Sequence, residues 1–90
     1  MIVKSLARTA TAISPLELAV GDTVLEHGAT LRITAQNHRW TDQPSGRVVV
    51  NWLTEYVEGT TGWADIDAIM KRGDYHVQGN ELARVLRLPR

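Results

Sequence analysis

Turn-forming residues cut this chain into pieces too short for a bundle of helices. Seven glycines and three prolines are dispersed through its 90 residues, and the segments between them mostly alternate in polarity or are rich in β-branched side chains. This spacing of turn-forming residues is typical of short strands in a small antiparallel sheet that curls on itself. We therefore expect a mainly β fold, a small barrel of about five strands with one or two short helical turns. A chain of this length supports one hydrophobic core, so residues 1–90 are expected to form a single domain.

Two segments in the middle of the chain carry the strongest strand signals. Over residues 29–36 apolar and polar side chains alternate, which predicts a half-buried strand. Residues 47–57 are dense in valine and aromatic residues on both alternating faces, which predicts a strand at the centre of the sheet. Residues 37–46 are polar and contain Pro44, Ser45 and Gly46, so we expect a long hairpin loop there.

The segment before this hairpin has the chemistry of a short helix. Ser14 can cap it, Pro15 suits its first position, and Glu17 stands three residues after the cap. Gly21 ends it after about one turn. Residues 1–13 are expected as a strand or as a loosely held arm. The apolar residues around the turn are expected to face the core: Leu16, Leu18 and Val20.

The best α-helix candidate covers residues 65–72, with acids in its first turn, bases in its last and Gly73 just beyond. It is too short to be stable alone, so we expect it to close an open end of the barrel. Trp63, just before it, is expected to fold back as a lid, and Trp52 is expected in the core. The other expected elements are strands over residues 23–26, 75–78 and 82–88, with turns at His27 and Gly28 and at Gly79 and Asn80.

Composition excludes several classes of protein. The chain has no cysteine, which rules out a disulfide framework and a thiolate metal site. No apolar run approaches the roughly 20 residues that span a membrane. Lys4 and Arg8 interrupt the apolar residues near the start, unlike a signal peptide, so we expect a cytoplasmic protein. Ten basic residues balance ten acidic ones in blocks of alternating sign, and we expect these blocks to pair across neighbouring strands.

The sequence contains no catalytic motif. His27, His38 and His76 form no His-x-His or His-x-x-x-His pair, and the glycines form no phosphate-binding loop, so neither a metal nor a cofactor is expected. In an extended segment Asp74 and His76 point to the same side, which makes them the candidate acid/base pair. A metal-independent ribonuclease that uses this pair is the enzymatic alternative. We expect a protein that is not an enzyme.

A binding surface is a stronger prediction from this sequence than an active site. Trp40 lies in the predicted polar loop beside Arg39, and Arg32 and Arg47 lie on the flanking strands. Tryptophan next to arginine is typical of anchors in protein interfaces. The same residues would suit a nucleic-acid-binding barrel, but a net charge of zero leaves no surplus of positive charge for phosphates. We therefore expect a protein partner before nucleic acid, with a homodimer as a further alternative.

Two segments resemble known proteins. Residues 18–24, followed by Gly28 and residues 31–33, resemble the Gly-Asp, apolar, turn-Gly, strand opening common to many SH3-like barrels. Residues 75–80, with Ala83 and Arg84 soon after, are similar to the end of small uncharacterised proteins encoded in phages and prophages. Among small barrels we therefore expect an SH3-like one, and the strand pattern leaves an OB-like barrel or a simple meander as the alternatives.

The resemblance also implies a function. It implies a phage accessory protein that acts by protein contact in the host cytoplasm and engages or inhibits a host machine. The basic residues that nucleic-acid-binding SH3-like domains carry near the opening motif are absent, because Glu17, Asp22 and Glu26 stand there instead. This departure weakens the transfer of an RNA-binding role.

Overall fold

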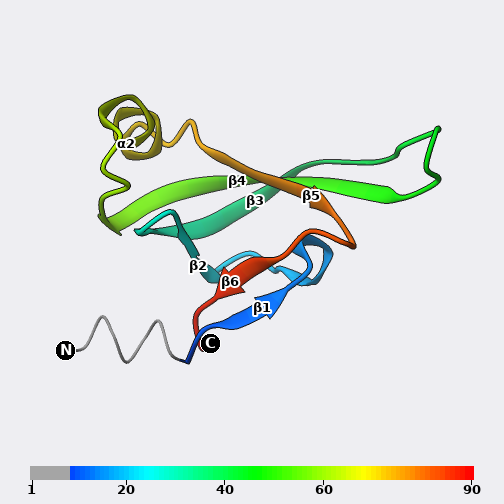
Figure 1. Cartoon of the computed structure of the whole chain (residues 1–90), viewed down its shortest axis with the longest axis horizontal. Coiled ribbons are helices and arrows are strands. Elements are labelled where there is room, and N and C mark those ends of the chain that lie inside the picture. The colour runs from blue at the N-terminus through cyan, green and yellow to red at the C-terminus, as the bar shows by residue number, and fades with distance from the viewer. Residues whose placement is uncertain (1–8) are drawn as a thin grey trace.

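The computed structural model describes residues 9–90, which fold into one antiparallel sheet with one α-helix and one 3₁₀ turn (Figure 1). The six strands lie in the order β1-β6-β2-β3-β4-β5. The mainly β class that the sequence predicts is confirmed. In chain order the elements are β1 (Thr11–Ile13), η1 (Pro15–Glu17), β2 (Thr23–Glu26), β3 (Ala29–Thr41), β4 (Val48–Gly59), α2 (Ala64–Lys71), β5 (His76–Asn80) and β6 (Val85–Arg87).

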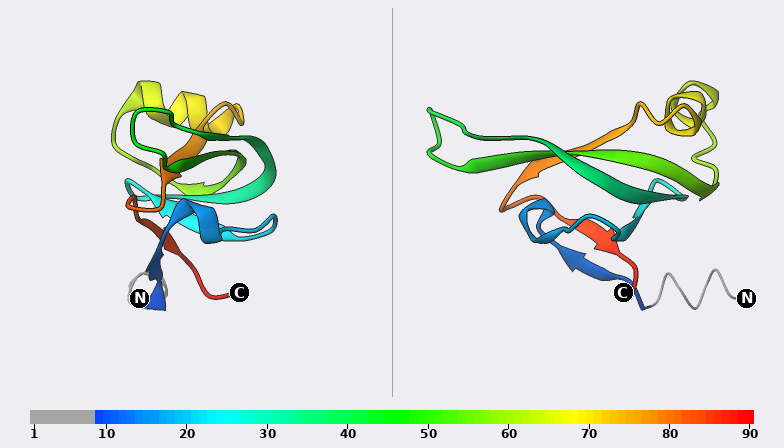
Figure 2. Two further views of the ribbon diagram at one scale, coloured as in Figure 1. Left: turned by 90° about the vertical axis from the view of Figure 1, so that its right-hand side faces the viewer. Right: turned by 180° about the vertical axis from the view of Figure 1, so that it is seen from behind.

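The sheet curls until its two ends approach each other (Figure 2). β6 pairs with both β1 and β2, which joins the ends of the chain to the meander of β2, β3, β4 and β5. η1 then lies against β5 and β4, at the far end of the strand order. The Trp52 indole N–H donates to the Pro15 carbonyl at 2.8 Å, and the Ser14 hydroxyl donates to the Asn80 carbonyl at 3.3 Å. These bonds hold the two ends of the sheet together as a small curled barrel.

The short turn η1 forms as its sequence predicts. The Ser14 hydroxyl accepts a hydrogen bond from the Leu16 N–H at 3.2 Å, and the Glu17 carboxylate accepts one from the Ser14 N–H at 3.3 Å. This reciprocal capping box satisfies backbone donors at the start of the turn. Leu18 is buried and Leu16 packs against the core, as expected. The prediction for Val20 is wrong, since it is 63% exposed where the chain turns into β2.

The turn between β2 and β3 requires an unusual backbone. His27 and Gly28 have φ angles of 53° and 96°, the left-handed values that suit a two-residue hairpin turn. Gly28 is also in close contact with the next loop, because a Cβ there would lie 2.7 Å from the Thr60 carbonyl oxygen. Both constraints favour glycine at this position, and the predicted turn is confirmed.

The hairpin of β3 and β4 is longer than predicted. The expected loop over residues 37–46 is wrong for its first half, because β3 continues to Thr41 and pairs with β4 as far as Val48. Backbone pairing with a valine-rich strand overrides the polar composition of residues 37–41, whose side chains are exposed. The remaining turn is compact. The Ser45 hydroxyl donates to the Asp42 carboxylate at 2.6 Å, and the Asp42 N–H donates to the Arg47 carbonyl at 2.8 Å.

Register shifts curve this hairpin. Two of them leave Thr34 and Asn37 of β3 without partners in β4, and a third lies near Thr30. Each extra residue reverses which side chains face the core, so Ala35 faces outward, contrary to the predicted alternation. The second reversal cancels the first. Arg39, opposite the buried Val50, therefore lies on the inner side again.

The helix α2 closes one end of the barrel, as predicted. Met70 is fully buried in the core, and Ile66 packs against it. The Asp67 carboxylate accepts hydrogen bonds from the hydroxyls of Thr60 and Thr61 at 2.6 and 2.8 Å, which ties the preceding loop to the helix. The buried core comprises Ile13, Leu18, Val24, Ala29, Leu31, Ile33, Val50, Trp52, Met70, Val77 and Val85.

The elements at the two ends of the chain differ from the predicted boundaries. Gly79 and Asn80, expected as a turn, are the last residues of β5 and pair with β4. The last strand is limited to Val85–Arg87, because its partners β1 and β2 are themselves short. At the other end, Thr11–Ile13 form a strand, and residues 1–8 of the expected strand or arm lie outside the described residues. Within residues 9–90, no helix has the length and apolar character needed to cross a membrane.

Candidate functional site

Trp40 lies on the outer side of the β3–β4 hairpin, away from the core. It stands opposite Val49 in the register and is 36% exposed. His38, two residues earlier, has its ring centroid 5.5 Å from that of Trp40, with 47° between the ring planes. Val49 is half-buried beside them. The rings of His38 and Trp40 therefore form an exposed aromatic surface on the outer side of the sheet.

A ladder of amide side chains crosses the same outer side. The Asn37 side-chain amide donates to the Asn51 side-chain oxygen at 3.0 Å, and the Asn51 amide donates to the Gln78 oxygen at 2.9 Å. Asn51 is only 7% exposed, so these bonds satisfy polar atoms that would otherwise be costly to bury. The ladder joins β3, β4 and β5 and fixes the surface next to Trp40. We call the side chains of His38, Trp40, Val49, Asn51 and Gln78 the outer patch.

Arg39 does not belong to the outer patch. Neighbouring residues of a strand point to opposite sides, and Arg39 is on the side of Val50. Its side chain is exposed, and within residues 9–90 it forms no salt bridge. The sequence predicts a loop here, in which Arg39 and Trp40 would lie together. The structure presents them on two sides of one strand.

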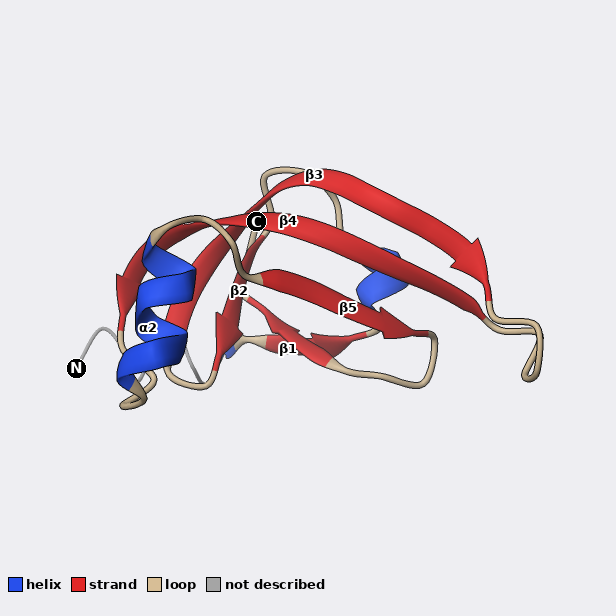
Figure 3. Cartoon of the chain, turned by 90° about the horizontal axis from the view of Figure 1, so that it is seen from above, coloured by secondary structure: helices blue, strands red, loops and turns tan. Residues whose placement is uncertain are grey.

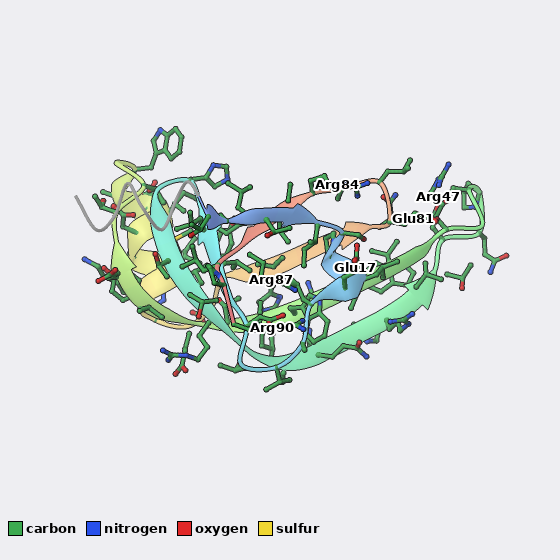
Figure 4. The ribbon with its side chains drawn as sticks, turned by 90° about the horizontal axis from the view of Figure 1, so that it is seen from below. Glu17, Arg47, Glu81, Arg84, Arg87 and Arg90 are labelled. Carbon is green, nitrogen blue, oxygen red and sulfur yellow. The ribbon has the colours of Figure 1, made fainter. Side chains whose placement is uncertain are left out.

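The other two predicted arginines are engaged in ion pairs. Arg32 on β3 lies 2.9 Å from the Glu55 carboxylate on β4. Arg47 lies 3.2 Å from Glu81, and Figure 4 shows this pair near the hairpin tip. Both pairs are exposed, so each contributes little to stability, about 0–1 kcal/mol. The Arg32–Glu55 pair agrees with the expected pairing of basic with acidic blocks, whereas Glu81 lies in a part of the chain, residues 71–90, that is itself net basic. The four predicted residues therefore do not assemble into one basic patch.

The candidate acid/base pair is not assembled. The Asp74 carboxylate pairs with the Arg72 guanidinium at 3.0 Å, and no hydrogen bond joins Asp74 to His76. His76 begins β5 and stands opposite Leu53, with its side chain exposed. Residues 9–90 contain no cluster of three or more histidine, aspartate or glutamate side chains able to hold a metal ion. Asp74 and His76 therefore do not form the hydrogen-bonded pair that the sequence predicted.

Trp63 is an exposed aromatic residue that sequence reasoning assigned wrongly. It is 60% exposed, and its ring centroid lies 6.0 Å from that of His27, edge to face. The predicted lid does not form because the bonds from Thr60 and Thr61 to Asp67 hold the loop against α2. The two threonines before a glycine, followed by an acid in the first helical turn, are the signal that could have indicated this loop.

A cleft of about 580 Å³ lies at the start of β2, lined by residues 19–23 together with Pro89 and Arg90. The Asp22 carboxylate in it is 5% exposed and accepts hydrogen bonds from the Arg90 guanidinium at 2.8 and 3.1 Å. These bonds, with help from the Ala19 N–H and the nearby Arg87 charge, hold the pKa of Asp22 below its ordinary value. Figure 4, which views the molecule from below, shows the positions of Arg87 and Arg90. The acid of the cleft is thus already paired.

Comparisons of the chain with protein-family models, with curated proteins and with solved structures find no match.

Proposed function

We propose that the protein is a non-enzymatic binding module that contacts another protein through the β3–β4 hairpin. The observation that carries the proposal is Trp40, a large ring held at the surface beside the amide ladder. Tryptophan provides a large contact area with few rotatable bonds, which suits it to anchor an interface. Arg39 lies on the other side of the same strand without a salt bridge within residues 9–90. A partner that lies along the hairpin would meet both.

The resemblance of residues 75–80 to phage proteins supports a specific setting for this activity. In this proposal the partner is a host protein, the contact takes place in the host cytoplasm, and it modulates or inhibits a host machine. Net neutrality supports a protein partner, because a nucleic-acid ligand is attracted chiefly by surplus positive charge.

The test is a capture experiment with matched variants. The tagged chain is used to capture proteins from bacterial lysate, and the affinity of the captured partner is then measured with purified protein. Trp40→Ala and Arg39→Ala should each weaken binding about tenfold or more, as expected for interface anchors. Trp63→Ala removes another exposed tryptophan at the α2 end and should leave binding unchanged. Full-strength binding by both hairpin variants would show that the contact lies elsewhere.

Nucleic acid is the second candidate, and one observation favours it. The rings of His38 and Trp40, with centroids 5.5 Å apart, offer a platform on which unpaired bases could stack. This alternative predicts binding to a labelled single-stranded oligonucleotide that weakens steeply as salt rises. An absence of binding at low salt eliminates it.

A further inference from the structure

The outer half of β3 forms an open edge of the sheet. β2 covers β3 only as far as Arg32 in the register, with further backbone bonds at Ile33. Among the strands of residues 9–90, β4 alone pairs with β3 from Thr34 to Thr41, and Figure 3 shows this half of the strand along the border of the sheet. We call residues 34–41 the open β3 edge. An unpaired strand edge is a template for another strand.

Only part of this edge is regular enough to accept a strand. The bulges at Thr34 and Asn37 interrupt its first half, and bulges hinder edge-to-edge pairing. Residues 38–41 follow without interruption, and they pair with residues 48–51 in continuous register. The regular stretch also carries Arg39 and Trp40.

The backbone groups of this stretch have a defined direction. The Asp42 N–H donates to the Arg47 carbonyl, toward β4. Hydrogen-bonding direction alternates from residue to residue along a strand. The N–H and C=O groups of Thr41 and Arg39 therefore point away from β4, and β4 is the strand with which this part of β3 pairs. No other strand within residues 9–90 pairs with this side of β3, so these four groups can bond an added strand.

Side chains around the edge indicate what kind of strand fits. Arg39 is exposed on the inner side without an ion pair within residues 9–90, whereas Arg47 on the same hairpin is paired with Glu81. Trp40 and His38 lie on the outer side. A strand added here sends alternate side chains to the two sides. An acidic side chain would pair with Arg39, and an apolar one on the other side would contact Trp40.

A second copy of this chain fits the same edge less well. If two copies paired antiparallel through residues 38–41, both Arg39 side chains would lie on one face of the joint ribbon. The like charges would oppose each other, while an acidic segment of another protein gains from the same charge.

We propose that the partner binds by strand addition to the open β3 edge, through an extended segment that places an acidic side chain against Arg39 and an apolar one against Trp40. This inference rests on the proposed function and specifies its mode. The affinity comes from main-chain hydrogen bonds to Arg39 and Thr41, and the selectivity comes from the two side chains.

The experiment uses the full chain and a library of random linear peptides. The winning peptide is synthesised and titrated into isotope-labelled protein, and amide hydrogen exchange is followed by NMR. We expect enriched peptides with an acidic residue among alternating apolar residues, and at least about tenfold slower exchange of the Arg39 and Thr41 amides on binding. Arg39→Glu should weaken the binding of this peptide. It should strengthen the binding of a version of the peptide that carries lysine in place of the acidic residue.

A backbone variant isolates strand addition from side-chain contact. Thr41→Pro removes an N–H that faces away from β4, and proline is tolerated at such a position on an edge strand. The substitution should weaken the affinity for the peptide about tenfold or more. Thr41→Val keeps the N–H and should bind normally. Circular dichroism checks the fold of both. If the proline variant does not fold, N-methylation of the peptide at alternate residues tests the same bonds, and one of the two methylation patterns should abolish binding.

Several outcomes overturn the inference. These are a library without enriched peptides, a selected peptide that leaves the Arg39 and Thr41 amides unprotected, or self-association through this edge without any peptide. If Trp40→Ala loses the captured host protein while folded Thr41→Pro keeps it, the proposed function survives and strand addition is wrong. If Trp40→Ala, Arg39→Ala and folded Thr41→Pro all bind that protein at full strength, both are wrong.

Discussion

At the residue scale, the buried Asp22 carboxylate makes polar contacts both near in the chain and far along it. It is 5% exposed and holds Arg90, which stands 68 positions later in the chain. It also accepts the Ala19 N–H at 2.9 Å, within the turn that leads into β2. One side chain thus fixes a local turn and fastens the final residues against the start of β2. Gly21 and Asp22 indicate the turn in the sequence, but nothing local indicates the arginine.

The contact between Asp22 and Arg90 predicts that the protein loses stability in acid. The pKa of Asp22 is lower in the folded protein than its ordinary value of 3.8, chiefly because of the hydrogen bonds to Arg90. The ionised carboxylate therefore stabilises the fold above the unfolded pKa, and this stability is lost as pH falls through the lower folded pKa. Asp22→Asn keeps an acceptor for the Ala19 N–H but removes the charge. It should lower the urea midpoint at neutral pH and flatten its decline below pH 3.8.

Arg90→Gln is the matched control for this prediction, because it removes the same ion pair from the other side. It should show a similar loss at neutral pH. An Asp22→Asn variant that is as stable as the parent at neutral pH, with the same decline in acid, would contradict the role given to the pair.

At the element scale, α2 shows how a helix too short to be stable alone is held by packing. Its sequence indicates both ends, with acids first, a base last and a glycine beyond, and the structure places it within one residue of the predicted range at each end. What the periodicity does not indicate is which side chain enters the barrel. That side chain is Met70, with no exposed surface.

Truncation of this side chain should unfold the protein more easily. Met70→Ala leaves a cavity in the core and should lower the free energy of unfolding by about 2–5 kcal/mol. Met70→Leu nearly conserves the volume and should cost less than about 1.5 kcal/mol. Urea denaturation followed by circular dichroism measures both. Equal effects of the two substitutions would show that α2 does not close the core as described.

The β3–β4 hairpin marks the limit of element prediction. The alternation of residues 29–36 and the β-branched residues 48–50 correctly indicate two strands. The polar residues 37–41 are strand as well, because backbone pairing with β4 continues through them. Local composition cannot reveal this pairing, because each polar side chain is exposed and is equally compatible with a loop. The faces of Arg39 and Trp40 follow from this pairing.

At the scale of the whole molecule, one continuous sheet and one shared core determine how the protein unfolds. η1 and its cap residue Ser14 form hydrogen bonds with residues of β4 and β5, and α2 contributes Met70 to the same core as β2, β3 and β6. No described element has a core of its own. The balance of ten basic against ten acidic residues is expressed partly as pairs between neighbouring elements, such as Arg32 with Glu55 and Arg47 with Glu81.

This arrangement predicts a single cooperative transition. Trp52 is 6% exposed, whereas Trp40 and Trp63 are exposed, so the change in tryptophan fluorescence should chiefly report the core. Its midpoint in urea should coincide with that of far-ultraviolet circular dichroism, which reports the sheet. An earlier fluorescence transition with the sheet intact would indicate that the core around Trp52 opens separately.

Taken by itself, the sequence determined the mainly β class, the turn at His27 and Gly28, the capping box at Ser14, and the place of Trp52 in the core. These features depend on residues close together in the chain or on a simple alternation. Only the tertiary structure decided the length of the hairpin, the exposure of Trp63, the pairing of Asp22 with Arg90 and the open β3 edge. The physical reason is that register, bulges and burial depend on partners far away in sequence, and the same local pattern is compatible with several of them.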